Sequence, residues 1–243
     1  SVVIHEVGHN YFPMIVNSDE RQWTWMDEGL NSFVQYLAEQ EWDRDYSSRR
    51  GGASSIVNYM KGDKSNIMPI MTNSESIYQF GANAYGKPAT ALNILRETIM
   101  GRELFDFAFK EYSQTWMFKH PTPTDFFRIM ENASAVDLDW FWRGWFFGND
   151  HVDISLDSVD WYQLSSMNPE IEKELQKEEK GNSPEYIGRI RNETDVKETV
   201  TERDPAARDF YDNYDKDQVT DRDKTEYEDF LADLSDEERE LVS

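Results

Sequence analysis

The chain has no cysteine, and this absence removes two kinds of site at once. Neither a disulfide nor a thiolate-bound metal can form, so a metal site must use His, Asp or Glu ligands. Apolar runs long enough to cross a membrane are also missing, and we expect no membrane-spanning segment. The lack of cysteine does not choose between cytoplasm and periplasm.

Positive charge is scarce, since 25 Lys and Arg stand against 48 Asp and Glu and the net charge is −23. The balance is −7 over residues 1–150 and −16 over residues 151–243. Such a surface repels nucleic acid and anionic lipid, so we expect neither as a partner. We favour solubility or a salty environment as the reason for the acidity, over the alternative of a specific cationic ligand.

A methionine start is also lacking, because the first residue is Ser1. The predicted helix that carries His5 begins almost at once, and a natural amino terminus rarely opens inside a catalytic element. We therefore expect a piece of a longer protein, whose targeting signal would lie upstream of Ser1. Composition is no obstacle to folding, because 38% hydrophobic and 14% aromatic residues can bury a sizeable core.

Apolar periodicity predicts a mainly α-helical domain over residues 1–160. A first helix is expected to stop at Pro13, and a second helix has one apolar face, marked by Met26, Leu30, Phe33, Val34, Leu37 and Ala38. Further helices are predicted over 53–62, 88–99, 102–117 and 123–133. The aromatic run WFWRGWFF at 140–147 is predicted as a buried plug, with a substrate platform as the alternative. Alternation at Val152, Ile154 and Leu156 suggests one short strand.

Residues 161–243 are predicted as an acidic, charged helical extension. The stretch IEKELQKEEKGNSPE indicates a charged helix that ends at a Gly-Asn-Ser-Pro break. Thr220 with Asp223, and Ser235 with Glu238, have the spacing of capping boxes. We expect these helices to pack on the main body.

The clearest chemical pattern is His5-Glu6-Val7-Gly8-His9. On a helix, His5 and His9 lie one turn apart on the same face, so both can bind one ion. Glu6 lies beside that ion without ligating it, where it can take a proton from bound water. A catalytic zinc needs a third protein ligand, and Glu28, early in the second helix, fits that role. The sequence therefore predicts one zinc ion bound by His5, His9 and Glu28.

The residues that follow His9 exclude other classes of zinc peptidase. Sites of the metzincin type need a glycine and a third histidine shortly after the motif, and those positions hold Phe12 and Ile15. The inverted order His-x-x-Glu-His is absent from the chain.

His-Glu-x-x-His, followed after eighteen residues by Glu, resembles the aminopeptidase N family of zinc metallopeptidases, a gluzincin group that also includes leukotriene hydrolases. The segment WMDEGLNSF is similar to the Asn-Glu-Gly-Phe segment of that family, and YGKPATALNILRETIMGRELFDFAFKEYSQTW is similar to its Tyr-x-Lys-Gly segment and following helices. The likeness covers about residues 1–150 and implies the helical lobe of a thermolysin-like catalytic domain. Asp27 replaces the usual Asn, and Pro88 the usual Gly.

The resemblance implies an aminopeptidase that removes N-terminal residues from peptides. It also implies that Tyr85 donates to the developing oxyanion, with Tyr78 as the fallback. Asp27 is either a partner of a zinc histidine or an ordinary charge at a helix end. No compartment is assigned, and the resemblance slightly favours a periplasmic or extracellular one.

Two rival functions remain open from the sequence. One is a zinc endopeptidase or another zinc hydrolase, because the family segment that holds the substrate amine is not in this chain. The other is a non-catalytic, zinc-stabilised interaction module. A fourth protein ligand would favour the module, since structural zinc sites are usually closed.

Overall fold

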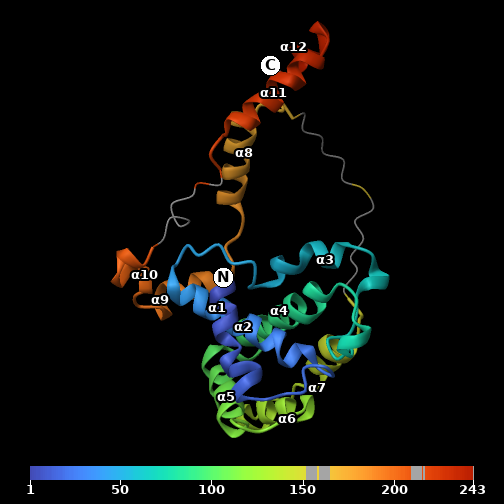
Figure 1. Cartoon of the computed structure of the whole chain (residues 1–243), viewed down its shortest axis with the longest axis vertical. Helices are drawn as coiled ribbons and strands as arrows, with labels where there is room; N and C mark the ends of the chain where they lie inside the picture. Colours follow the sequence, from blue (N-terminus) through green and yellow to red (C-terminus); the bar gives the residue numbers. More distant parts are fainter. Residues whose placement is uncertain (152–157, 159–164, 209–214, 216, 243) are drawn as a thin grey trace. The chain divides into compact units, whose positions relative to one another are not determined.

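The computed structural model describes residues 1–151, 158, 165–208, 215 and 217–242, and these are mainly helical (Figure 1). No strand occurs among these residues, which confirms the predicted mainly α fold class. The short strand predicted at Val152, Ile154 and Leu156 lies outside the described residues. None of the described helices combines the length and apolarity that a bilayer span requires.

Residue contacts divide the chain into two compact units. The first unit contains Ser1–Val152 and Tyr186–Pro205, and the second contains Asp153–Glu185 and Ala206–Ser243. The first unit therefore takes in a stretch from the predicted extension, while the division at residue 160 stays a prediction.

The first unit is built from helices joined by short helical turns. Its α-helices are α1 (Val2–Gly8), α2 (Glu28–Trp42), α3 (Val57–Lys61), α4 (Lys87–Ile94), α5 (Arg102–Thr115), α6 (Pro123–Ser134), α7 (Asp139–Trp142), α9 (Ile187–Asp195) and α10 (Val200–Arg203). The turns are Asn10–Ile15, Thr24–Met26, Ala53–Ile56, Lys64–Asn66, Ser74–Ser76, Gly81–Gly86, Leu95–Met100, Arg143–Phe147 and, at the border of the units, Pro205–Ala207. The helices predicted over 53–62, 88–99, 102–117 and 123–133 are all present.

The first helix is shorter than predicted. We expected it to run as far as Pro13, but α1 ends at Gly8 and a separate turn covers Asn10–Ile15. Within that turn Phe12 has φ −116° and ψ 109°, which is not helical. The residue before a proline is driven out of the helical region by a clash with the proline ring, so the break falls ahead of Pro13 and not at it.

The core of the first unit is rich in aromatic rings. Trp25 packs edge-to-face on Phe146, with ring centroids 4.9 Å apart, and Phe33 packs on Phe105 at 5.3 Å. Within the aromatic run, Phe141, Trp142 and Phe146 are buried as predicted. Trp140 and Phe147 are exposed instead, so the plug is only partly buried. Leu30 and Phe33, from the predicted apolar face of α2, are fully buried.

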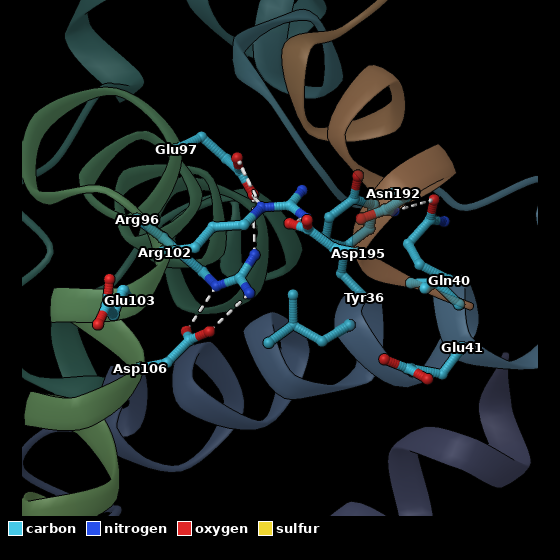
Figure 2. A pocket seen from close by; sticks show the side chains of 12 residues that line it. Tyr36, Gln40, Glu41, Arg96, Glu97, Arg102, Glu103, Asp106, Asn192 and Asp195 are labelled. Atoms are coloured by element: carbon cyan, nitrogen blue, oxygen red, sulfur yellow. Dashed lines mark hydrogen bonds and ion pairs between the residues drawn. The ribbon is translucent and has the colours of Figure 1, made fainter. Parts of the chain in front are cut away.

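Arginine side chains hold residues 186–205 against the rest of the first unit, and Figure 2 shows one of them, Arg102, with Glu97 and Asp195. The carboxylate of Glu97 is buried and accepts hydrogen bonds from Arg102 at 2.9 Å and from Arg191 of α9 at 2.8 Å. Burial alone would raise the pKa of Glu97, but these hydrogen bonds outweigh it and hold the pKa below its usual range. Arg102 also pairs with Asp195 of α9 at 2.8 Å.

A second anchor lies at the end of α2. The guanidinium of Arg44 donates to the carbonyl oxygens of Asn192 and Val196, at 3.2 and 2.7 Å, and pairs with Glu202. A cavity of about 460 Å³ remains beside the first anchor, lined by residues of α2, α5 and α9 (Figure 2). No residue of the predicted zinc site lines this cavity.

The second unit contains α8 (Pro169–Asn182), α11 (Asp221–Asp233) and α12 (Asp236–Val242). The predicted break after α8 and both predicted capping boxes are present, with Thr220 Oγ1 and Ser235 Oγ donating to the carboxylates of Asp223 and Glu238. Lys173 of α8 pairs with Asp223 of α11 at 2.8 Å, which ties these two helices together.

Candidate metal centre

Two helices that touch closely supply the predicted metal ligands. His5 lies on α1 and His9 caps its end, while Glu28 is the first residue of α2. Asn31 of α2 donates a hydrogen bond to the carbonyl oxygen of His5 at 2.8 Å. A β-carbon on Gly8 would stand 2.0 Å from the Asn31 amide oxygen, so the contact depends on a glycine in α1.

The three predicted ligands meet through one atom each. His5 Nε2 is 3.0 Å from Glu28 Oε2, and His9 Nε2 is 3.3 Å from the same oxygen. The two imidazole Nε2 atoms are 3.1 Å apart. His5, His9 and Glu28 thus form a group whose potential ligand atoms all lie within 4.8 Å of one another.

The other nitrogen of each ring faces a hydrogen-bond acceptor. His5 Nδ1 is 2.9 Å from Gln35 Oε1, and the Gln35 amide nitrogen donates to Glu39 at 2.7 Å, which fixes the amide orientation. His9 Nδ1 is 2.9 Å from the carbonyl oxygen of Phe12. When a neutral imidazole donates its one hydrogen from Nδ1 to such an acceptor, its Nε2 carries the lone pair.

It follows that two lone pairs and a carboxylate oxygen converge on one point. Three acceptors without a donor between them repel one another, and a cation relieves that repulsion. Two imidazole nitrogens and one carboxylate oxygen are also a donor set that zinc accepts in catalytic sites. The structure brings the three residues together, and zinc binding itself stays a prediction.

Asp27 lies directly before α2 and combines the two roles considered from the sequence. It is the N-cap residue of α2, although its side chain makes no capping hydrogen bond, and its Oδ1 is 3.0 Å from His9 Nδ1. Burial raises the pKa of its carboxyl, the charge of Glu28 raises it further, and His9 opposes both. Since Asp27 faces the protonated nitrogen of His9, it helps to orient that ring.

Tyr85, Tyr78 and Glu6 have clearly different surroundings. The Tyr85 hydroxyl donates to Glu28 Oε1 at 2.6 Å, and its ring stacks on His5 with centroids 5.7 Å apart. Burial and the hydrogen bond to Glu28 raise the pKa of the Tyr85 phenol, so it stays a protonated donor. Tyr78 is 67% exposed. Glu6 is exposed and lies outside the three-residue group, and its role as the general base stays a prediction.

Sequence reasoning missed Gln35 and Glu39, which support His5 from behind. The signal that could have found them is spacing. Gln35 follows Glu28 by seven residues, two helical turns, and Glu39 follows Gln35 by four, so the three share one face of α2. Polar side chains repeated on one face of a helix that is otherwise buried indicate a hydrogen-bonded network.

Comparison with known proteins gives several partial matches. Residues 1–145 match the model described as peptidase family M1 domain. Glutamyl aminopeptidase from Sus scrofa is 28% identical over 144 residues, 57% of this chain and 15% of that protein. The human glutamyl aminopeptidase is 27% identical over the same length. Probable aminopeptidase 2 from Sulfurisphaera tokodaii is 26% identical over 156 residues, 60% of this chain and 19% of that protein.

The match spans only about 15% of the length of the glutamyl aminopeptidases. No solved structure matches the chain significantly. The resemblance to the aminopeptidase N family is nevertheless confirmed, and family M1 is in general zinc-dependent. Because the family model covers residues 1–145 of 243, the chain belongs to peptidase family M1.

Proposed function

We propose that this chain carries the zinc-binding, helical part of an aminopeptidase that removes N-terminal residues from peptides. One observation carries the proposal, namely the convergence of the two imidazole Nε2 atoms and the Glu28 carboxylate between α1 and α2. The names of the related proteins support the same activity, since several are called glutamyl aminopeptidase.

Each residue around the centre has a chemical role in this proposal. Zinc held by His5, His9 and Glu28 would supply a Lewis acid and lower the pKa of water. Glu6, exposed beside His5, would accept a proton from the attacking water and return it to the leaving amine. The Tyr85 hydroxyl would donate to the peptide carbonyl oxygen as negative charge develops there.

The test uses the protein expressed with its native flanking sequence. We expect one zinc per chain by elemental analysis, and cleavage of peptides with a free amino terminus but not of their N-acetylated forms. Glu6→Gln should keep the zinc and lower turnover by about two to four orders of magnitude. Cleavage of acetylated peptides would replace the aminopeptidase with an endopeptidase. Full zinc retention in a His9→Ala, Glu28→Ala double variant would rule out the site.

A further inference from the structure

Arg50 lies in the loop that follows α2, and hydrogen bonds fix the course of that loop. The Ser48 hydroxyl donates to the buried carboxylate of Glu39, the residue that orients Gln35. The Arg50 backbone nitrogen in turn donates to Ser48 Oγ at 3.1 Å. The loop is therefore connected to the network behind His5.

Two glycines then hold the loop against aromatic rings. Gly51 has φ +135°, and a β-carbon there would lie 3.2 Å from the Tyr36 ring. A β-carbon on Gly52 would lie 2.4 Å from the ring of Tyr186, in the segment docked by arginines. Because both positions are packed this closely, the direction in which Arg50 leaves the backbone is fixed in advance.

The guanidinium of Arg50 lies beside Tyr85, the neighbour of the candidate metal centre. Its central carbon lies 5.4 Å from the centroid of the Tyr85 ring, and Tyr85 donates to the ligand Glu28. Burial lowers the pKa of Arg50, while the charges of Glu39, Tyr85 and Glu28 raise it. Arg50 is thus a half-buried cation directly beside the catalytic tyrosine of the proposed mechanism.

Unlike other half-buried arginines of the first unit, Arg50 has no carboxylate partner among the residues that the structure describes. Arg96 pairs with Asp106 at 2.6 Å, and Arg102 and Arg191 pair with Glu97. Within the part of the chain that the structure describes, the Arg50 guanidinium makes no hydrogen bond or ion pair with a side chain. In a chain with 48 acidic residues, its five N–H donors remain available to a ligand.

We propose that Arg50 binds a carboxylate of the peptide substrate and so makes the enzyme prefer substrates that carry one near the scissile bond. A planar guanidinium binds a carboxylate through two parallel hydrogen bonds, and this pair is stronger when it is partly shielded from water. The carboxylate can be an acidic side chain or the C-terminus of a short peptide. The inference rests on the proposed aminopeptidase function.

Two matched substrate pairs test the inference and separate the two sources. One pair has N-terminal Glu or Gln, and the other is a dipeptide as free acid or as C-terminal amide. Arg50→Gln should lower kcat/KM about 10- to 100-fold for the acidic member of one pair, and leave its neutral partner nearly unchanged. For the acidic substrate, kcat/KM of Arg50→Lys should lie between wild type and Arg50→Gln, because lysine keeps the charge but cannot donate two parallel hydrogen bonds. Arg49→Gln, at the exposed neighbouring arginine, should behave as wild type.

The alternative is that Arg50 only supports the Tyr85 ring, and it gives a different result. All four substrates would then lose turnover by the same factor in Arg50→Gln, and the inference would be wrong. It would also be wrong if the wild type cleaved both members of each pair equally well. Absence of cleavage of every peptide would instead contradict the proposed aminopeptidase function.

A binding measurement that needs no turnover gives a second readout. Glutamate and glutamine are titrated into the protein while the Arg50 Nε–Hε resonance is followed by NMR. If the acidic side chain is the source, glutamate should shift this resonance and glutamine should not. If the kinetics favour that source and neither amino acid shifts the resonance, the contact is contradicted.

Discussion

At the residue scale, hydrogen-bond acceptors outside the metal centre determine which nitrogen of each histidine ring carries the hydrogen. Gln35 accepts from His5, and the carbonyl oxygen of Phe12 accepts from His9, so the Nε2 lone pairs of both rings face Glu28. Orientation of this kind strengthens a metal ligand, and loss of such a partner typically lowers metal affinity about 10- to 100-fold.

Gln35 gives the first prediction. Gln35→Met keeps the volume but removes the acceptor of the His5 Nδ1 proton, so zinc affinity should fall about 10- to 100-fold. Competition against a chelator of known affinity measures it. Gln40→Met, on the same helix and equally buried, is the control, because Gln40 hydrogen bonds with Asn192 and not with a histidine. Equal losses of affinity in the two variants would mean that only folding had changed.

Tyr85 gives a kinetic prediction. Tyr85→Phe deletes the hydroxyl and leaves the ring stacked on His5, so turnover should fall about 10²–10³-fold while zinc is retained. The Michaelis constant should change little, because the hydrogen bond strengthens mainly in the transition state. Steady-state kinetics beside the exposed Tyr78→Phe decide the matter. A Tyr78 variant that lost turnover while Tyr85→Phe kept it would reverse the assignment.

Spacing alone was enough to select His5, Glu6, His9 and Glu28, because a helix has a fixed period and zinc needs few ligand types. Gln35 and Glu39 also follow the helical spacing from Glu28. The role of a buried amide or carboxylate, however, depends on its neighbours in the fold, which the sequence does not place. Arg50 could not be found from sequence at all. Its place beside Tyr85 depends on a loop course that two glycines and a distant tyrosine determine.

At the scale of elements, the position of α2 depends on close approach to its neighbours, which a glycine permits, more than on helix propensity. Gly29 in α2 faces α4 and the turn before it, and a β-carbon there would lie 2.7 Å from Pro88 Cγ and 3.2 Å from the carbonyl oxygen of Ala84. The helix next to the metal centre is therefore packed against the segment that carries Tyr85.

A pair of glycine substitutions tests this packing. Gly29→Ala should destabilise the protein by about 1–3 kcal/mol, because the added methyl group overpacks α2 against Pro88. Gly144→Ala should be neutral or stabilise by up to about 1 kcal/mol, because nothing lies within 4 Å and alanine favours a helix. Urea unfolding of both variants measures the difference. If Gly29→Ala were as stable as Gly144→Ala, α2 could move away from Pro88 without cost and the predicted overpacking would be wrong.

Helices α2, α5 and α6 could be predicted because their apolar residues recur with the period of a helix, and because Gly101 and Pro123 mark the starts of α5 and α6. The end of α1 could not, since Phe12 leaves the helical region under the influence of the residue after it. The packing of α9 and α10 against the first unit's other helices could not be predicted from apolar periodicity either. Their contacts are mostly ion pairs and hydrogen bonds, and a charged helix with a thin apolar face does not reveal its partner.

At the scale of the whole molecule, the acidic region after residue 160 is not of one kind. Residues 186–205 bring Arg191 to the buried carboxylate of Glu97 and Tyr186 to Gly52, and so complete the first unit. Residues 206–243 are grouped with the second unit.

Two truncations should therefore differ. A chain that stops after Pro205 should keep its zinc and the stability of the first unit. A chain that stops after Glu185 also loses Arg191 and Tyr186. Its free energy of unfolding should be lower by about 2 kcal/mol or more, because the buried carboxylate of Glu97 loses one of its partners. Urea titrations with zinc analysis compare them. Equal stability of the two chains would show that the docked segment contributes nothing to the fold.

The docked segment also turns the chain between Val152 and Tyr186 into a closed loop, because both of its ends belong to the first unit. Lengthening a connection between two fixed ends costs entropy that grows only with the logarithm of its length, about 0.6 kcal/mol for each doubling. Insertions in this stretch that leave α8 (Pro169–Asn182) intact should thus be better tolerated than a break in the chain at either anchor. This stretch is a natural position for a fluorescent reporter or an affinity domain, placed where both junctions are held and the zinc-binding helices stay untouched.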